Sequence, residues 1–340
     1  MIVTTDMRFG LPGGRGDLET GGPTSVTELS RTAEALGFDS LWFTDGHLTS
    51  VGSRTLRAQP APIPLAAAAA AVTSRIRLGF TALHVAQYDP IRLAADLATL
   101  DRLSGGRVIL GVGWPVADYA RVTRCPGGDA DLPEALDTVL RYWRGCSVVA
   151  DGAQYRVGPT PVQHPHPPVE IAAHTDESIV WAAGRRYGLL LAATGTTQAM
   201  AEQAALYVSR GGRTADLRVE RFCLVARTDG EADQIARPIV ERLTGRLASL
   251  GGDEHGHRTA GPPELDPVRF LRETAIVGGP ETVARRLTAL RDELGVEQVN
   301  IRPSFSGTVP LRVQQNSVRL FASKVLPIIR GLPTRQAAHQ

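Results

Sequence analysis

The amino-acid sequence predicts an α/β fold, namely a (β/α)8 TIM barrel with insertions after strands four and seven. Three observations lead to this prediction. The segment 75–114 has the pattern of a strand, a helix and a second strand with short connections. Eight apolar segments along the chain each precede a helical segment, and 340 residues suit one barrel with insertions.

The segment 75–114 shows the repeating unit in full. An apolar run at 76–83 is followed by Asp and Pro at 89–90, residue types that cap and open a helix. The glycine pair at 105–106 ends that helix, and a second apolar run at 108–112 completes the unit. Four leucines recur at helical spacing and are expected on one apolar face: Leu93, Leu97, Leu100 and Leu103.

The same alternation continues through the rest of the chain. Strands are predicted at 7–11, 40–44, 76–83, 108–112, 169–173, 189–193, 218–226 and 298–302, each before a helix. A hairpin that turns at Asp151-Gly152 is predicted at 148–157. One domain is therefore expected over 1–332, with a disordered tail over 333–340.

Composition and charge restrict the classes of partner. A formal net charge of +2 gives no reason to expect a nucleic-acid partner. The alanine-rich run at 65–72 is too short to span a membrane. Cys125, Cys146 and Cys223 show neither a disulfide nor a metal-ligand pattern, and no signal peptide is evident, so a cytoplasmic location is expected.

Four groups of residues follow predicted strands, at the end where barrel enzymes carry their chemistry. They are Asp45 to His47, Thr81 to His84, Gly113-Trp114, and His174 to Ser178. The imidazole of His47 titrates near neutral pH and can move a proton, although a loop histidine bonded to Asp45 is an equally good interpretation. The helix start after His174 offers N–H groups that bind phosphate, and it can equally be a plain N-cap.

Several short motifs, in order along nearly the whole chain, are similar to the bacterial luciferase-like superfamily. They are LGFDSLW at 36–42, SRIRLG at 74–79, LDRLSGGR at 100–107, LGVG at 110–113 and VGGPETV at 277–283. The resemblance implies the barrel fold and an oxidoreductase. Members of this superfamily use reduced FMN with oxygen, or an 8-hydroxy-5-deazaflavin coenzyme for hydride transfer.

The resemblance also implies roles for the residues at the strand ends. It places a non-proline cis peptide near Thr81-Ala82, against the flavin ring, and the flavin phosphate on Thr175 and Ser178. The expected cofactor-binding residues are Thr81, Ala82, Gly113, Trp114, His174, Thr175 and Ser178. The expected catalytic residues are His47, Asp45 and His84, and no metal site is expected, since the His255-x-His257 pair lacks further ligands nearby.

Two departures from the superfamily pattern keep the cofactor open. Gly46 stands where oxygenases often have a histidine, and Trp114 stands where they often have an arginine that pairs with the FMN phosphate. The first hypothesis is a monooxygenase that uses reduced FMN and oxygen on a small organic substrate, in secondary metabolism. The alternatives are a deazaflavin-dependent oxidoreductase and a non-catalytic flavin-binding protein.

The expected partners follow from what the chain lacks and from the resemblance. The glycines at 111–113 lack the third glycine of a dinucleotide-binding fingerprint, so an FMN oxygenase of this kind needs a separate flavin reductase. The resemblance further implies a homodimer that forms through helices near the first strands.

Overall fold

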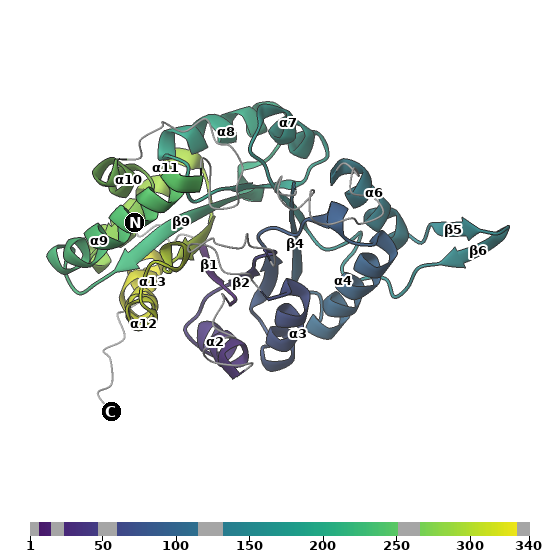
Figure 1. Cartoon of the computed structure of the whole chain (residues 1–340), viewed down its shortest axis with the longest axis horizontal. Helices are drawn as coiled ribbons and strands as arrows, with labels where there is room; N and C mark the ends of the chain where they lie inside the picture. Colours follow the sequence, from purple (N-terminus) through teal and green to yellow (C-terminus); the bar gives the residue numbers. More distant parts are fainter. Residues whose placement is uncertain (1–6, 15–23, 47–59, 115–131, 251–265, 332–340) are drawn as a thin grey trace. The chain divides into compact units, whose positions relative to one another are not determined.

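A computed structural model describes residues 7–14, 24–46, 60–114, 132–250 and 266–331 (Figure 1). Eight parallel strands, each followed by a helix, give the (β/α)8 barrel that the sequence predicts. Each of these strands overlaps a predicted one. The strands are β1 (Arg8–Pro12), β2 (Ser40–Phe43), β3 (Arg77–Phe80), β4 (Val108–Gly113), β7 (Val169–Ala172), β8 (Gly188–Leu191), β9 (Leu217–Val225) and β11 (Gln298–Arg302).

The helices between these strands also match the predicted pattern. They are α2 (Thr24–Ala35), α3 (Pro62–Val72), α4 (Pro90–Ser104), α6 (Leu132–Trp143), α7 (Asp176–Gly184), α8 (Thr197–Ser209), α9 (Asp229–Leu250), α10 (Pro267–Glu273), α11 (Pro280–Leu294), α12 (Leu311–Leu320) and α13 (Leu326–Arg330). Within the described residues, no helix combines the length and the apolar character needed to cross a bilayer.

The chain divides into two compact units, each of which is described by itself. The β2–β7 unit contains residues 12–34 and 39–172, and the β8–β11 unit contains residues 1–11, 35–38 and 173–340. In the β2–β7 unit, neighbouring strands pair in parallel in the order β2, β3, β4, β7. In the β8–β11 unit, β9 pairs with β8 and β11, and β11 pairs with β1. The expectation of a single domain over 1–332 stays a prediction.

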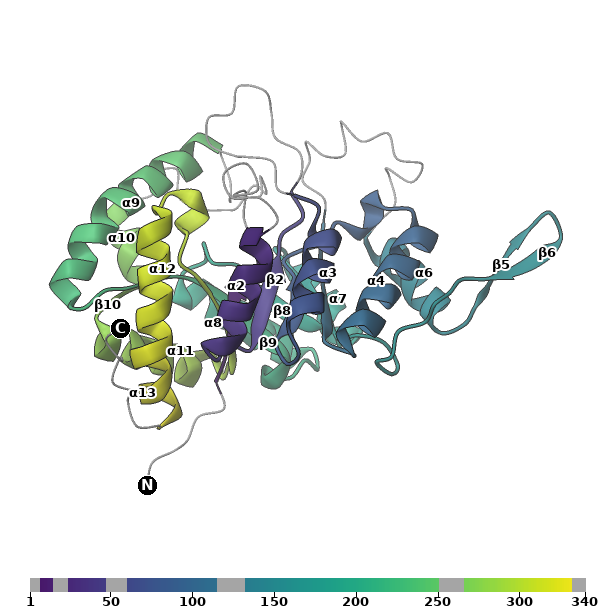
Figure 2. The same cartoon turned by 90° about the horizontal axis from the view of Figure 1, so that it is seen from below.

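The connections after the fourth and seventh barrel strands hold two extra pieces of sheet. The predicted hairpin is confirmed as β5 (Ser147–Ala150) and β6 (Ala153–Arg156), with positive φ at both Asp151 and Gly152. Figures 1 and 2 show this hairpin extending away from α4 and α6. A short strand that the sequence does not predict, β10 (Ala275–Gly278), pairs with the last four residues of β9.

The helix α4 forms where its end signals predict. The carboxylate of Asp89 accepts the backbone N–H of Arg92 at 2.8 Å, and Gly105 ends the helix with a φ of 67°. One detail of the prediction is wrong: Leu103 is 67% exposed, whereas Leu93, Leu97 and Leu100 are buried. At 100° per residue Leu103 lies about 80° around the helix from Leu93, so it leaves the buried face.

Arg107 ties together the chain segments at the N-terminal ends of β3 and β4. Its Nε donates to the carbonyl of Ser104 at 2.6 Å, and its Nη1 and Nη2 donate to the carbonyls of Ile76, Ala70 and Thr73 at 2.8–3.0 Å. Burial lowers the pKa of this guanidinium, and the charge of Glu34 acts in the opposite direction. Arg107, the last residue of the LDRLSGGR motif, is therefore a structural residue in this fold.

Glu34 at the end of α2 holds the segment that leads into β3. Its carboxylate accepts the backbone N–H groups of Ser74, Arg75 and Ile76 at 2.7–3.2 Å. Partial burial alone would raise the pKa of Glu34, but the bonds from Ile76, Arg75 and Ser74 and the charge of Arg75 lower it. Its ionised form is thus favoured in the folded state.

Replacing Glu34 with glutamine is expected to reduce stability by about 1 kcal/mol near pH 7, after allowance for screening by solvent. Because the pKa is lowered on folding, this contribution is present above the pKa of the unfolded chain and is lost as the pH falls through the folded value. Thermal melts of both proteins between pH 3 and 7 should therefore converge at the acid end. The exposed Glu28→Gln is the control, and parallel Tm profiles for wild type and Glu34→Gln would contradict the assignment.

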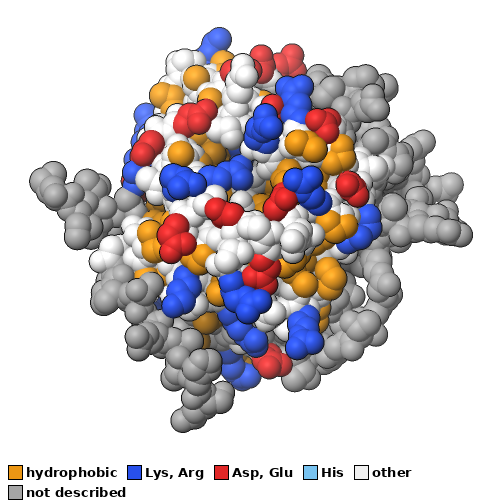
Figure 3. Space-filling model, turned by 90° about the vertical axis from the view of Figure 1, so that its left-hand side faces the viewer, with side chains coloured by type: hydrophobic (Ala, Val, Ile, Leu, Met, Phe, Trp, Pro, Cys, Tyr) orange, Lys and Arg blue, Asp and Glu red, His pale blue; other side chains and the backbone are white. Residues whose placement is uncertain are grey.

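The helical surface of the β8–β11 unit carries charges of both signs. Exposed pairs one helical turn apart lie on α9 and α10, with Arg237 to Asp233 at 2.7 Å and Arg269 to Glu273 at 3.0 Å. Figure 3 shows basic and acidic side chains interspersed on this face, with apolar side chains between them. Such exposed pairs contribute little stability, about 0.5 kcal/mol each.

Candidate active site

A buried carboxylate lies just after β2 in the β2–β7 unit. Asp45 is 1% exposed, and its Oδ2 accepts the backbone N–H of His84 at 3.2 Å and the hydroxyl of Tyr88 at 2.9 Å. The Nδ1 of the buried His84 ring lies 4.0 Å from the same oxygen. The ends of β2 and β3 thus meet at one carboxylate, which holds the backbone of His84 and lies close to its imidazole ring.

The segment after β3 carries the non-proline cis peptide Thr81-Ala82, at the position that the resemblance implies. Backbone hydrogen bonds hold this segment against β4: Leu83 N–H donates to the carbonyl of Gly111 at 2.9 Å, and Gly113 N–H donates to the carbonyl of Leu83 at 3.0 Å. The chain beyond β3 therefore continues alongside β4 up to the strand ends.

Small side chains line the strand ends next to this segment. A Cβ placed on Gly113 would lie 3.1 Å from the Cβ of Ala82 and 3.5 Å from the Cβ of Ala172. Ala82 and Ala172 are half-buried, and Gly113 between them is buried. We call Ala82, Gly113 and Ala172 the small-residue cradle. A flat aromatic ring can approach the backbone closely at such a surface.

Larger groups fill the strand positions that precede the cradle. The ring of Trp42 occupies the space above Gly79, where a Cβ would come within 2.5 Å of it, and its Nε1 donates to Ser40 at 2.8 Å. Glu170, a buried acid on β7, is in register with Gly111. In the sequence, Glu170 stands out only because it is the one charged residue of an otherwise apolar predicted strand.

The structure brings six of the predicted site residues into the β2–β7 unit, at the ends of β2, β3 and β4. They are Asp45, Thr81, Ala82, His84, Gly113 and the half-buried Trp114. His47 lies outside the described residues, and so do Cys125 and the His255-x-His257 pair. Among the residues that the structure describes, no three His, Cys, Asp or Glu side chains are grouped as a metal site would require.

The other three predicted residues belong to the β8–β11 unit, where they begin α7. Thr175 and Ser178 form a reciprocal capping box: Ser178 N–H donates to Thr175 Oγ1 at 3.3 Å, and Thr175 N–H donates to Ser178 Oγ at 3.1 Å. His174 is half-buried and precedes this cap. Thr175 is thus the N-cap of α7, as one of the two interpretations of the sequence expects. A helix N-terminus of this kind can also bind a phosphate.

Sequence reasoning missed a polar cluster on one face of β9 and β11 in the β8–β11 unit. Arg302 Nη1 donates to Glu220 Oε2 at 3.2 Å, with both side chains buried, and Arg218 Nη1 donates to Asn300 Oδ1 at 3.4 Å. The guanidinium of Arg302 also lies 5.6 Å from the ring centre of Phe222. The sequence signal for this cluster was the presence of charged residues at alternate positions of the predicted strand, Arg218 and Glu220.

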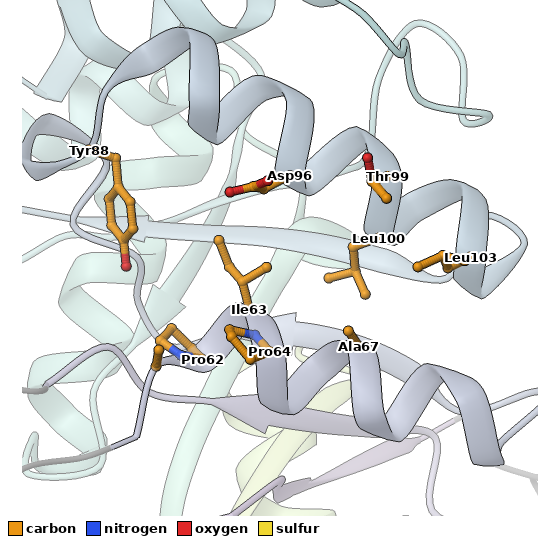
Figure 4. Close-up of a pocket in the computed structure, with 10 residues that line it drawn as sticks. Pro62, Ile63, Pro64, Ala67, Tyr88, Asp96, Thr99, Leu100 and Leu103 are labelled. Carbon is orange, nitrogen blue, oxygen red and sulfur yellow. The ribbon is translucent and has the colours of Figure 1, made fainter.

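Tyr88, which the sequence does not single out, joins the Asp45 network to an outer groove. A groove of about 340 Å³ lies between α3 and α4. Figure 4 shows Tyr88 at one end of the side chains that line it. Its other lining residues are mainly apolar: Ala61, Pro62, Ile63, Pro64, Ala67, Asp96, Thr99, Leu100 and Leu103. The ring therefore contributes to the groove while its hydroxyl contacts the buried carboxylate.

Removing the Tyr88 hydroxyl is expected to destabilise the protein by about 1 kcal/mol, since buried Asp45 would lose the hydrogen bond from this hydroxyl while the ring stays in place. Chemical denaturation of Tyr88→Phe measures the change. Tyr155→Phe is the matched control, because Tyr155 is exposed on the β5–β6 hairpin. Equal stability of Tyr88→Phe and wild type would show that the hydroxyl makes no net contribution.

Comparison with known proteins identifies the family of this barrel. Residues 7–298 match the family described as luciferase-like monooxygenase. The chain belongs to this family. Its members include flavin-dependent monooxygenases and F420-dependent oxidoreductases, where F420 is the deazaflavin coenzyme.

Solved structures and one curated relative illustrate both branches of this luciferase-like family. The monooxygenase RslO1 from Streptomyces bottropensis superposes with a TM-score of 0.75 at 26% identity, over 95% of this chain and 99% of that one. The oxygenating constituent of 3,6-diketocamphane monooxygenase from Pseudomonas putida, in complex with FMN, gives a TM-score of 0.72 at 21% identity, over 97% and 100% of the two chains. The F420-dependent glucose-6-phosphate dehydrogenase of Nakamurella multipartita is 31% identical over 180 residues, which cover 48% of this chain and 49% of that protein.

Proposed function

We propose that this luciferase-like protein is a monooxygenase that uses reduced FMN and oxygen to oxygenate a small organic substrate. The observation that carries the proposal is the small-residue cradle of Ala82, Gly113 and Ala172 at the strand ends. It fits the flat ring of a flavin, because no side chain beyond a methyl group projects from these three residues. RslO1, a monooxygenase at 26% identity over nearly the whole chain, supports the same assignment.

The chain's own residues would bind and orient the reactants. The cradle would support the ring, and half-buried Trp114 would add an apolar wall that excludes water. Asp45 holds the backbone of His84, whose ring nitrogen would take up or deliver a proton during turnover. When bound, reduced FMN supplies the electrons and the reactivity toward oxygen.

Two further site assignments belong to this proposal. The backbone N–H groups and hydroxyls of Thr175 and Ser178 would hold the flavin phosphate at the start of α7, where the exposed Asp176 and Glu177 must point away from it. His47 would complete the catalytic set with Asp45 and His84. Unchanged turnover of His47→Ala would remove His47 from that set.

A deazaflavin-dependent oxidoreductase is the second candidate, favoured by one specific observation. Trp114 occupies the position where FMN oxygenases often carry an arginine for the phosphate, and the relative from Nakamurella multipartita is F420-dependent. This candidate would use the same cradle for the deazaflavin ring. Hydride transfer would then replace oxygenation.

Anaerobic titration separates these candidates. Reduced FMN and 8-hydroxy-5-deazaflavin are added separately to the protein, and binding is followed by fluorescence. Binding of reduced FMN, followed by substrate-dependent oxygen uptake, is the expected result. Tight deazaflavin binding without FMN binding would establish the second candidate, and flavin binding without turnover would leave a non-catalytic family member.

The proposed monooxygenase requires a source of reduced flavin. The relative from Pseudomonas putida is an oxygenating constituent, which means that it acts with a further component. We therefore propose a separate flavin reductase as a partner. Addition of an NADH-dependent flavin reductase should start turnover, whereas NADH alone should not.

We also propose that the protein forms a homodimer through the groove between α3 and α4. This groove is lined mainly by apolar side chains, among them Leu103, which is 67% exposed, and a contiguous exposed apolar surface is typical of a protein–protein contact. Light scattering should show a dimer for the wild type and a monomer for Leu103→Glu. Val268→Glu, at an exposed apolar residue of α10, should remain dimeric.

A further inference from the structure

A smaller cavity of about 160 Å³ lies within the β8–β11 unit, among α8, β9, β10 and α11. Its lining residues combine two arginines, two glutamates and two threonines with apolar side chains: Thr197, Arg221, Glu273, Thr274, Ala275, Ile276, Arg286, Ala289, Leu290 and Glu293. We call this space the Arg221 cavity. None of its residues belongs to the proposed flavin site.

Arg221 is a buried cation on the face of β9 opposite to Glu220. The residue is 1% exposed, and its Nη1 and Nη2 donate to the carbonyl of Gly195 at 2.7 Å and to Thr197 Oγ1 at 3.1 Å. Both acceptors are neutral. Among the residues that the structure describes, no carboxylate lies within ion-pair distance of this guanidinium. Buried cations in proteins are normally paired with an anion.

The positive charge of Arg286 acts unfavourably on the cation of Arg221. Burial, together with the positive charge of Arg286, lowers the pKa of Arg221 to about 10, and the charge of Glu293 acts in the opposite direction. Arg286 is itself half-buried, and burial lowers its pKa as well. Its Nη2 donates to the backbone carbonyl of Arg272 at 2.9 Å, another neutral acceptor. Two desolvated guanidinium groups thus repel each other at this cavity.

The acidic residues of the Arg221 cavity neutralise it only in part. Glu273 forms an ion pair with Arg269 of α10 at 3.0 Å. Arg269 therefore compensates the negative charge of Glu273, which leaves less of it to neutralise Arg221 and Arg286. Glu293 is exposed, and solvent therefore screens its charge. The cavity also contains Thr197, the first residue of α8, so the positive end of that helix faces the same space.

We infer that the Arg221 cavity binds a small oxyanion, a phosphate or carboxylate group, between the guanidinium groups of Arg221 and Arg286. Guanidinium groups bind such oxygens through paired N–H donors. The volume of about 160 Å³ holds a single group of this kind and leaves room for little more. The inference is independent of the identity of the flavin, because it concerns other residues of the β8–β11 unit.

Inorganic phosphate is the probe that tests the inference. Calorimetric titration of the wild type with phosphate, in buffer whose ionic strength is held constant with chloride, should show saturable binding. Arg286→Gln should weaken this binding by about tenfold or more, since one of two charge-assisted contacts is lost. Glu293→Gln should strengthen it, because a like charge beside the anion is removed. Arg237→Gln, which alters an exposed arginine paired with Asp233, should bind as the wild type does.

The start of α7 is the competing phosphate site, and a second variant distinguishes the two. If Ser178→Ala abolishes phosphate binding while Arg286→Gln leaves it unchanged, the phosphate is bound at α7 and the inference is overturned. Absence of saturable binding to the wild type would overturn it as well. Glycerol 3-phosphate and acetate, titrated in parallel, identify whether a phosphate ester or a carboxylate is preferred over the free ion.

Discussion

Gly113→Val is expected to weaken binding of the flavin by about a hundredfold or more, with the fold retained. Even a Cβ at this position would lie 3.1 Å from Ala82, so the larger valine side chain must project from the cradle into the space of the ring. Valine is well suited to a strand, and Gly113 ends β4 without a positive φ. Anaerobic titration with the flavin that the wild type binds measures the affinity, and circular dichroism checks the fold.

Two further variants make this expectation specific to the cradle. Ala172→Val, on its opposite wall, should weaken binding in the same direction. Gly245→Ala places a methyl group where no atom lies within 4 Å, and it should leave the affinity unchanged. Wild-type affinity in both Gly113→Val and Ala172→Val would mean that the ring lies elsewhere, and the cofactor site would have to be reassigned.

Arg107→Ala is expected to lower the free energy of unfolding by about 3 kcal/mol or more, which is a large part of the stability of a typical domain. The substitution leaves the carbonyls of Ala70, Ile76 and Ser104 without the donor that they now share. The loss therefore affects α3, β3 and the start of β4 together. Equilibrium unfolding in urea measures the change.

The matched control for Arg107 is Arg92→Ala on α4. Arg92 makes one exposed ion pair with Asp96 at 3.4 Å, so its loss should cost about 0.5 kcal/mol or less. Arg107→Lys should recover only part of the stability, since an ammonium group cannot reach as many carbonyls at once. Similar losses for Arg92→Ala and Arg107→Ala would show that the buried bonds contribute no more than a surface pair.

The parts of the fold that the sequence predicts well are those set by local chemistry. The N-cap at Asp89, the left-handed Gly105 and the Asp151-Gly152 turn each depend on a few neighbouring residues, and the structure confirms all three. β10 was not predicted, because its four residues take their conformation from pairing with β9, far away in the chain. Leu103 was misplaced, because two successive three-residue steps from Leu97 turn it out of the buried face of the helix.

The candidate site shows the same limit. Strand ends could be predicted, and with them Asp45, Thr81 and Gly113 as positions of interest. The contact of Tyr88 with Asp45 spans 43 residues of sequence, and that of Arg302 with Glu220 spans 82, so no local pattern reveals either. The resemblance to the family motif did not reveal the role of Arg107 either, because a motif match does not distinguish a structural residue from a site residue.

The bonds of Glu34 and Arg107 have a consequence for how this chain can change over evolutionary time. Both residues anchor the N-terminal ends of β3 and β4, whereas Asp45, His84 and Gly113 lie at the opposite ends of strands in the same unit. Substitutions at the C-terminal strand ends that adapt the pocket to another substrate therefore leave the bonds of Glu34 and Arg107 intact. A library confined to the C-terminal ends of these strands should yield a high fraction of folded variants, and new specificities could be selected without prior stabilisation.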